Sequence, residues 1–407
     1  MNPYPHQVAM ADEAYAILKK HGLVYISAEE RTGKTLASML IVEQSSRSKV
    51  LVLTKKKALG GWSETIKARN SPLASYVTVV NYEAIHKRYK TPKGVVKYKL
   101  NLKPSDYDIV ILDEAHNSLS AFPNVGDIHS SLKKVCKGLP IIYLSATPSA
   151  QGYQQLFNQF RVSDYSPYKE VNAYRWFERY GISKLVRTSY GLQETYKKTK
   201  TSAWNDVSHL FVTMTRKEIG FEHEPEDIVH YVELDKGTKE LYNDCMETEM
   251  FKGEYPLDSS MKLRTTLHMI ESGVAKLDDA YVILDNMEKI KVIKEEFGDS
   301  PNNVIMYNYI AEETKLHQHF KYTKILSGIS FSEGVDLSMY DNLIILTQNF
   351  STAKHSQRRA RQANMKRFTP IKVHFYLVKG GISEQVYKTV SLNKLNFVDS
   401  IFTRETL

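Results

Sequence analysis

The sequence predicts an α/β protein with two parallel sheets in series, each covered by helices on both faces. Short apolar, β-branched runs recur along both halves of the chain, and amphipathic stretches separate them. The 407 residues also exceed what one ordinary hydrophobic core needs. We therefore expect a first domain over residues 1–222, with a helical extension after about residue 150, and a second domain over residues 223–407.

The runs that predict strands are apolar throughout, which is typical of strands buried on both faces. In the first half they are residues 24–27, 50–53, 77–80, 109–112 and 141–144. In the second half they are residues 304–307, 324–326, 343–346 and 373–378. Residues 151–222 lack this rhythm and predict the helical extension, and the acidic, proline-bearing stretch Glu222–Asp227 predicts the hinge.

The composition is that of a globular protein from a reducing compartment. Cys136 and Cys245 are the only cysteines, and neither has a Cys/His cluster near it, so a disulfide framework or a structural zinc site is not expected. The sequence has no apolar run of about 18 residues and no signal-peptide pattern, so we expect a cytoplasmic protein without a membrane span. The net charge of +9 permits a polyanionic partner without requiring one.

Residues 28–35, Ala-Glu-Glu-Arg-Thr-Gly-Lys-Thr, follow a predicted strand and open a predicted helix, which is the setting of a phosphate-binding loop. Main-chain N–H groups at a helix start favour phosphate; Lys34 would reach the β- and γ-phosphates, and the Thr35 hydroxyl would hold Mg²⁺. The other nucleotide-binding candidates in the loop are Ala28, Arg31, Thr32 and Gly33. Taken alone, the motif could also be a helix start with an exposed lysine.

The sequence Asp-Glu-Ala-His at 113–116 directly follows the apolar run 109–112. A carboxylate at the carboxyl end of a parallel strand is where a Mg²⁺ ligand belongs, so Asp113 is the predicted metal ligand beside Thr35. Glu114 can orient and deprotonate the attacking water. An acidic helix cap is the alternative. The two motifs in this order, each after a strand, together predict an ATPase.

With these motifs the chain resembles superfamily 2 helicases and translocases, in particular the Swi/Snf-type, DEAH-box-like DNA-dependent ATPases, over nearly its whole length. The resemblance implies two tandem RecA-like domains with the ATP site in the cleft between them, and it implies ATP and Mg²⁺ as cofactors. A motor without flanking modules looks like a phage or prophage member, which would act in the host cytoplasm.

In the first half the resemblance assigns roles to several further residues. Gln7, in Pro5-His6-Gln7, corresponds to the adenine-reading element. Residues 50–62 resemble motif Ia and residues 79–83 resemble motif Ib, and both contact the nucleic-acid backbone in the family. Residues 144–148 resemble motif III, which links hydrolysis to nucleic-acid binding. The coupling candidates are His116, Ser145 and Thr147.

In the second half, residues 304–309 resemble motif IV and residues 332–337 resemble motif V, while residues 357–364 resemble motif VI. The nucleotide-binding candidates of motif V are Gly334 and Asp336. The catalytic candidates of motif VI are Gln357, Arg358 and Arg361.

Within motif VI, Arg361 is the candidate finger for the γ-phosphate, a cation that stabilises transition-state charge. Ala360 and Asn364 replace the glycine and the second arginine of the family pattern, and Arg358 is the substitute for the missing charge. Without a phosphate loop elsewhere, residues 357–367 would be interpreted as a solvated basic helix face.

The basic stretch 86–100 predicts a hairpin that protrudes near the nucleic acid, because lysines alternate with Val, Tyr and Leu and Pro92-Lys93-Gly94 marks a turn. Its lysines would neutralise phosphates. The alternative is a solvated edge hairpin whose lysines only prevent aggregation. The nucleic-acid-binding candidates of the chain are Lys55, Tyr82, Lys93, Lys97 and Lys99.

The sequence thus predicts an ATP-dependent DNA helicase or translocase, a monomer that favours duplex over single-stranded DNA and remodels branched or protein-bound duplex. Two alternatives stay open. An RNA helicase is one, since the Asp-Glu-Ala-His motif does not choose between nucleic acids. The other is a nucleic-acid-binding module with a decayed ATP site, which the departures at Arg31 and Asn364 indicate.

Overall fold

The computed structural model describes residues 2–69, 75–92, 94–149, 152–188, 191–196, 198–221, 225–277, 280–328, 337–359, 362, 370–393, 397 and 402. The chain forms two compact units, Met1–Gly220 and Phe221–Leu407, and each has its own sheet. Among the described residues, no helix combines the length and the apolar character that crossing a bilayer requires.

Unit 1 is built on a six-stranded parallel sheet with the order β10-β1-β7-β6-β2-β3. All five strands predicted in this half lie in it. The strands are β1 (Leu23–Ala28), β2 (Val50–Thr54), β3 (Val77–Asn81), β6 (Ile109–Asp113), β7 (Ile141–Leu144) and β10 (Phe211–Met214).

Alternate residues of these strands face two separate cores, so helices cover both faces of the sheet as predicted. One face, which includes Val24, Val52 and Ile111, packs against α1 (Pro5–His21), α2 (Lys34–Gln44) and α3 (Leu59–Arg69). The other face, which includes Tyr25 and Leu112, packs against the remaining helices of the unit. These are α4 (His116–Leu119), α5 (Asp127–Val135), α6 (Gln154–Phe160), α7 (Ala173–Tyr180) and α8 (Ser202–Asn205).

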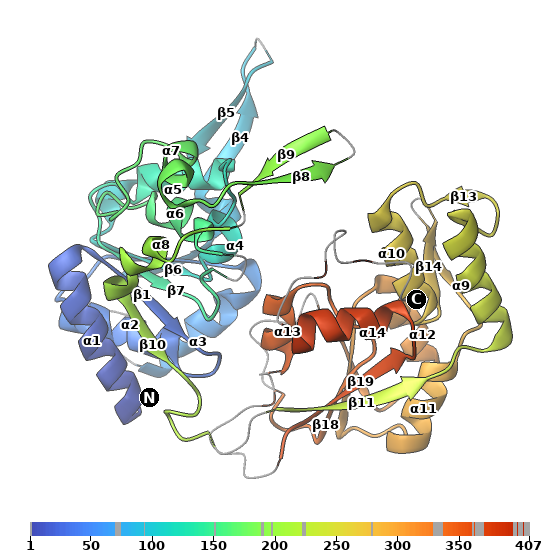
Figure 1. Ribbon diagram of the computed structural model, residues 1–407. Coiled ribbons are helices and arrows are strands. Elements are labelled where there is room, and N and C mark those ends of the chain that lie inside the picture. The colour runs from blue at the N-terminus through green and yellow to red at the C-terminus, as the bar shows by residue number, and fades with distance from the viewer. Residues whose placement is uncertain are drawn as a thin grey trace. The chain divides into compact units, whose positions relative to one another are not determined.

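Two antiparallel hairpins stand out from the body of unit 1 (Figure 1). The first joins β4 (His86–Lys90) and β5 (Val96–Leu100), where the sequence predicts a hairpin. The second joins β8 (Lys184–Thr188) and β9 (Gly191–Thr195). Short 3-10 helices connect several elements of the unit: η1 (Lys56–Ala58), η3 (Tyr82–Ile85), η4 (Pro104–Asp106) and η5 (Ser208–Leu210).

The stretch 151–222 is therefore only partly the helical extension that the sequence predicts. Helices α6, α7 and α8 lie in it, but so do the hairpin β8–β9 and the strand β10. The reason for the difference is that β10 is an edge strand with only its first two residues buried, and β8–β9 lies outside the main sheet. Neither needs the continuous apolar run that marks a central strand.

Unit 2 contains a five-stranded parallel sheet with the order β11-β19-β18-β16-β17. The four strands predicted in this half are all present. The strands are β11 (Glu226–Val232), β16 (Asn303–Tyr307), β17 (Lys324–Ser327), β18 (Asn342–Ile345) and β19 (Lys372–Val378).

The predicted hinge overlaps the first of these strands. Glu226 and Asp227 begin β11, while residues 222–224 lie outside the described residues. Asp227 accepts a hydrogen bond from Arg359 at 2.6 Å and one from the Tyr387 hydroxyl at 3.0 Å. The acidic end of the stretch is therefore part of the sheet, because β11 is an edge strand and its outer residues tolerate charge.

Helices lie on both faces of this sheet too. Tyr307 and Tyr376 pack on the face covered by α11 (Glu288–Phe297) and α12 (Ile310–His319). On the other face, the Phe375 ring contacts His355 of α13 (Thr352–Arg359) and Tyr387 of α14 (Ile382–Tyr387), which continues into the π-helical turn η7 (Lys388–Leu392).

An additional layer of unit 2 is formed by the segment between β11 and α11. It contains α9 (Lys236–Thr248), α10 (Ser260–Ile270) and two short hairpins, and its apolar residues pack with those of α14. The hairpin strands are β12 (Met250–Phe251), β13 (Tyr255–Pro256), β14 (Val274–Leu277) and β15 (Ala280–Ile283).

Candidate nucleotide site

The three motifs predicted to act on ATP lie at one edge of the unit 1 sheet. The phosphate loop follows β1, the Asp-Glu-Ala-His motif begins with the last residue of β6, and Ser145 follows β7. The strands are parallel, and the register pairs Asp113 with Leu144. Their carboxyl ends therefore meet at the same edge, which is where ligands bind in sheets of this kind.

The phosphate loop is closed by its own lysine. Gly33, with a φ of 86°, precedes the first residue of α2, and the Lys34 ammonium donates to the carbonyl oxygens of Ala28 (2.7 Å) and Glu29 (2.9 Å). The Thr32 hydroxyl donates to the Glu29 carbonyl at 2.8 Å, and this side chain is fully buried. Lys34 is thus held inside the loop at the start of a helix, where a phosphate would meet both the ammonium and the helix N–H groups.

Arg31 has a positive φ of 69° in this loop. A side chain in the left-handed region is disfavoured by about 1–2 kcal/mol, whereas glycine adopts this conformation readily. The backbone conformation at this position would therefore suit glycine better than Arg31.

The N-terminus of α1 supports the loop from outside. The Gln7 side chain is buried against Gly33, where an added Cβ would lie 1.9 Å from the Gln7 Nε2. The Gln7 Oε1 accepts the Tyr4 N–H at 3.0 Å, and the His6 Nε2 lies 3.2 Å from the Thr32 carbonyl oxygen. Gln7 is thereby placed beside the phosphate loop, and its adenine-reading role stays a prediction.

Asp113 is oriented by side chains from the stretch that resembles motif Ia. The Thr54 hydroxyl (2.7 Å) and the Trp62 indole N–H (2.8 Å) both donate to Oδ2 of this carboxylate. The Tyr82 hydroxyl donates to the Asp113 main-chain carbonyl at 2.8 Å. A half-buried carboxylate with a fixed orientation, beside a helix that begins with Lys34 and Thr35, supplies the hard oxygen ligands that Mg²⁺ prefers.

The three predicted coupling residues are linked by hydrogen bonds, and they lie next to Glu114, whose φ is also positive at 51°. The His116 Nδ1 lies 3.4 Å from the Glu114 Oε2 and 2.7 Å from the Ser145 Oγ. The Ser145 Oγ in turn accepts the Thr147 N–H at 3.0 Å. The structure brings these residues together, and their coupling role stays a prediction.

His116 is neutral at physiological pH in this surrounding. Burial lowers the pKa of its imidazole to about 3, and the nearby cations Lys55 and Lys34 lower it further. A neutral imidazole can exchange hydrogen-bond partners between the carboxylate of Glu114 and the Ser145 hydroxyl without a change of charge.

Three residues at this edge were not recognised in the sequence. Thr54 and Trp62 hold Asp113, as described above. Arg216, which follows β10, donates its main-chain N–H to the Glu29 carboxylate at 2.8 Å, and its guanidinium lies 3.5 Å from the Glu30 carboxylate. A polar residue that ends an apolar run was a usable signal for Thr54. No local pattern marks Arg216, because its partners are distant in sequence.

The nucleic-acid-binding candidates have different surroundings. Lys97 and Lys99 are exposed on β5 and alternate with half-buried residues, and Lys55 is half-buried near His116. Lys93 lies outside the described residues. Tyr82 is 1% exposed and its hydroxyl donates to the Asp113 carbonyl oxygen, so in this structure its side chain supports the end of β6. Its role in nucleic-acid binding stays a prediction.

Two predicted catalytic residues of unit 2 are buried. Gln357 and Arg358 are 5% and 2% exposed. The Arg358 guanidinium donates to the Gly328 carbonyl (3.0 Å) and to the Asn308 Oδ1 (3.2 Å), and burial lowers its pKa to about 10. In this arrangement Arg358 binds its own unit, and its catalytic role stays a prediction. The candidates Gly334, Asp336 and Arg361 lie outside the described residues, as do the departures Ala360 and Asn364.

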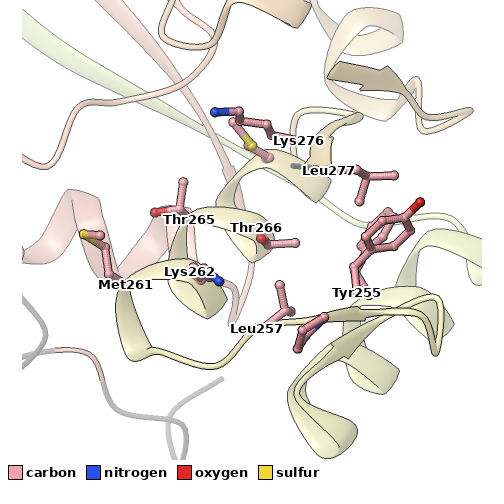
Figure 2. Close-up of a pocket in the computed structure, with 11 residues that line it drawn as sticks. Tyr255, Leu257, Met261, Lys262, Thr265, Thr266, Lys276 and Leu277 are labelled. Carbon is pink, nitrogen blue, oxygen red and sulfur yellow. The ribbon is translucent and has the colours of Figure 1, made fainter. Parts of the chain in front are cut away.

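Unit 2 also contains a pocket of about 360 Å³ beside α10 (Figure 2). Its wall includes Leu257 and Tyr255, and the ammonium groups of Lys262 and Lys276 border it. Of the predicted site residues that the structure describes, none lines this pocket.

Residues 1–150, which include the phosphate loop, Asp113–His116 and Ser145–Thr147, match the family described as "Type III restriction enzyme, res subunit". The chain is also similar to two solved structures of the SWI2/SNF2 ATPase core of Sulfolobus solfataricus. The one in complex with dsDNA is 13% identical with a TM-score of 0.42, covering 98% of this chain and 93% of that one. The structure of the core domain by itself is 13% identical with a TM-score of 0.41, covering 99% and 91%. No curated protein matches the chain.

Proposed function

We propose that this chain is a superfamily 2 helicase-like ATPase core of the Snf2-like type, which hydrolyses ATP with Mg²⁺ and couples the hydrolysis to movement along duplex DNA. The observation that carries the proposal is the placement of Lys34, Asp113 and Glu114 at one edge of the unit 1 sheet. The proposal includes the predicted domains 1–222 and 223–407, the completion of the site by the second domain, and action as a monomer.

In ATP hydrolysis, the residues at this edge of the sheet would each have a separate role. Lys34 would exchange the carbonyl oxygens of Ala28 and Glu29 for phosphate oxygens. Thr35 and Asp113 would hold Mg²⁺, which neutralises phosphate charge when bound. Glu114 would orient the attacking water and accept its proton.

For coupling, the group His116, Ser145 and Thr147 gives a direct connection from the catalytic carboxylate to the segment after β7. A change in the hydrogen bonds of Glu114 during hydrolysis would alter the partner of His116, and hence the position of Ser145. Short hydroxyl side chains suit this role because they exchange partners with little movement.

For DNA, the support comes from the exposed face of the β4–β5 hairpin. Lys97 and Lys99 of β5 are exposed, and on the facing strand β4 the exposed Lys87 pairs with Lys99 and adds a third cation to the same face. Such a row of cations neutralises a phosphate backbone without reading sequence.

The first test is the steady-state ATPase activity of the full chain with no nucleic acid, duplex DNA, single-stranded DNA or RNA. Glu114→Gln serves as the inactive control, since it keeps the size of the side chain and removes the base. We expect turnover that is stimulated most by duplex DNA and absent in the variant. Stimulation by RNA alone would favour an RNA helicase, and the absence of nucleotide binding and turnover would favour a decayed site.

The hairpin is tested by the double variant Lys97→Ala/Lys99→Ala, with Lys133→Ala/Lys134→Ala on the exposed side of α5 as the matched control. We expect weaker binding to duplex DNA, with the slope of log affinity against log salt reduced by about 0.9 for each lost phosphate contact. An unchanged slope, or the same change in the control, would contradict a DNA-binding hairpin.

A further inference from the structure

A cluster of two histidines and a glutamate lies on the α11 face of the unit 2 sheet. His230 comes from β11, His374 from the neighbouring β19, and Glu296 from the last turn of α11. The His230 Nε2 lies 2.9 Å from the His374 Nδ1, and the His230 Nδ1 lies 3.1 Å from the Glu296 Oε2. One ligand atom from each of the three side chains lies within 4.8 Å of the other two.

Aromatic residues hold the cluster in place. The Tyr376 ring stacks on His230 with centroids 4.7 Å apart, and its hydroxyl donates to the Glu296 Oε2 at 3.1 Å. The Phe297 ring contacts His374 edge-on at 4.6 Å. A carboxylate oriented by a hydroxyl, and imidazoles fixed between rings, are the supporting contacts that bound metals have in proteins.

Hydrogen bonds alone do not satisfy the cluster. His374 is 5% exposed, and its Nε2 is buried without a hydrogen-bond partner among the residues that the structure describes. An unpaired polar atom in a buried position is unfavourable.

We propose that His230, Glu296 and His374 form a binding site for a zinc ion. Two imidazoles and one carboxylate are a ligand set that Zn²⁺ prefers, and the negative charge of the carboxylate suits a dication. The side chains of Glu296 and His230 are 36% and 17% exposed, so the ion can enter from solvent and a water can complete its coordination.

The role of the site is to join parts of unit 2 that are far apart in the sequence. The ion connects the edge strand β11 to β19 and fastens α11 onto both. Binding to the folded state alone raises stability in proportion to the logarithm of the ion concentration. The site is independent of the function proposed above, since all its ligands lie in unit 2 and none belongs to the nucleotide site.

The test is the binding of Zn²⁺ to the chelator-treated full chain by titration calorimetry, together with thermal unfolding with and without Zn²⁺. The key variant is Glu296→Gln, because this side chain is partly exposed and its amide still accepts the Tyr376 hydroxyl. We expect one site per chain, a higher unfolding temperature with Zn²⁺, and at least about tenfold weaker binding in the variant. Tyr376→Phe is expected to weaken binding about tenfold, through orientation of Glu296.

Two controls make the result decisive. His317→Ala/His319→Ala removes two histidines at the end of α12 and is expected to bind Zn²⁺ as the unchanged protein does. X-ray absorption of the zinc-loaded protein is expected to show nitrogen and oxygen ligands. No binding, equal affinity in Glu296→Gln, or sulfur ligands would overturn the proposal. If Glu296→Gln does not fold, as judged by circular dichroism, His230→Gln replaces it with the same expected loss.

Discussion

The two units share an architecture but use their charged side chains differently. In unit 1, Lys34, Asp113 and Glu114 are half-buried at the carboxyl edge of the sheet. Among the residues of unit 2 that the structure describes, five charged side chains are almost completely buried away from solvent. They are Glu271, Lys289, Glu312, Lys315 and Arg358, none of which is more than 3% exposed.

The buried charges of unit 2 bind the main chain of their own unit. The Glu271 carboxylate accepts the N–H groups of Ile382 (2.7 Å) and Ser383 (3.0 Å), which begin α14. The Glu312 carboxylate accepts the N–H of Tyr309 at 2.8 Å, and the Lys315 ammonium donates to the Gly273 carbonyl at 3.0 Å.

The comparison shows that the degree of burial distinguishes two kinds of charged side chain. Partly buried ones can bind a ligand, whereas fully buried ones stabilise the fold. A fully buried charge is tolerated only with partners around it, so removing it damages the unit. A half-buried charge at a strand end can exchange a protein partner for a ligand, so removing it should affect function first.

The largest expected effect concerns the edge of unit 1. Lys34→Ala removes the ammonium that would bind phosphate, and we expect ATP turnover to fall on the order of 10³-fold. The unfolding midpoint in urea should change little, because the Lys34 ammonium is half-buried and donates to carbonyl oxygens of its own loop. A loss of activity that accompanies a loss of stability of several kcal/mol would break the comparison.

The next effect concerns a buried charge of unit 2. Arg358→Leu removes the donor to the Gly328 carbonyl oxygen and one of the two donors to the Asn308 Oδ1, which keeps its hydrogen bond from Asn349, and we expect a loss of about 3 kcal/mol of unfolding free energy. The neighbouring Arg359→Ala is the matched control, since Arg359 is partly exposed in its ion pair with Asp227 and should lose about 1 kcal/mol or less. If Arg358→Leu instead keeps full stability and loses ATP turnover, Arg358 is catalytic.

A buried neutral group of unit 1 gives the third prediction. Burial lowers the pKa of His129 from 6.5 to about 4; the hydrogen bond of its Nε2 to the Asn158 carbonyl oxygen opposes this shift, and the nearby cations Arg161 and Lys133 add to it. As the pH falls from 6.5 towards 4, His129 is protonated in the unfolded chain before it is protonated in the folded protein. The free energy of unfolding therefore decreases over that range.

We expect His129 to contribute about 2 kcal/mol to this acid loss. Urea unfolding at pH 7 and pH 4.5, with His129→Gln for comparison, measures it. The same dependence on pH in both proteins would assign the acid loss to other groups.

A smaller effect is expected from the support of Asp113. Trp62→Phe keeps the aromatic packing and removes the indole N–H at the Asp113 Oδ2. We expect the Mg²⁺ concentration at half-maximal ATP turnover to rise about tenfold. Trp204→Phe is the control, because it leaves the hydrogen bonds of Asp113 unchanged. Its Mg²⁺ concentration at half-maximal ATP turnover should equal that of the unchanged protein.

The smallest effect is expected at Arg31. Because its φ is positive, Arg31→Gly relieves the strain that Arg31→Ala retains, so the glycine variant should be the more stable of the two by about 1 kcal/mol. Paired urea unfolding curves measure the difference. An alanine variant as stable as the glycine variant would mean that the loop adjusts its backbone.

The sequence by itself determined the central strands and the order of the motifs. The runs at 109–112 and 141–144 needed no other part of the chain to be recognised, because a strand buried on both faces must be apolar throughout. The phosphate loop and Asp113–His116 were recognised for a related reason, since polar residues that follow such a run must lie at the edge of the sheet.

Only the tertiary structure decided where partners distant in sequence meet. The edge strands β10 and β11 each pair with only one neighbouring strand, and most of their residues are not fully buried. Tyr82 and Arg358 have the residue types of binding groups, but packing buries both. His230, Glu296 and His374 lie together because β11 pairs with β19 and α11 packs on both strands. The local sequence pattern predicts secondary structure, but a site like this one depends on contacts between residues that are far apart in the sequence.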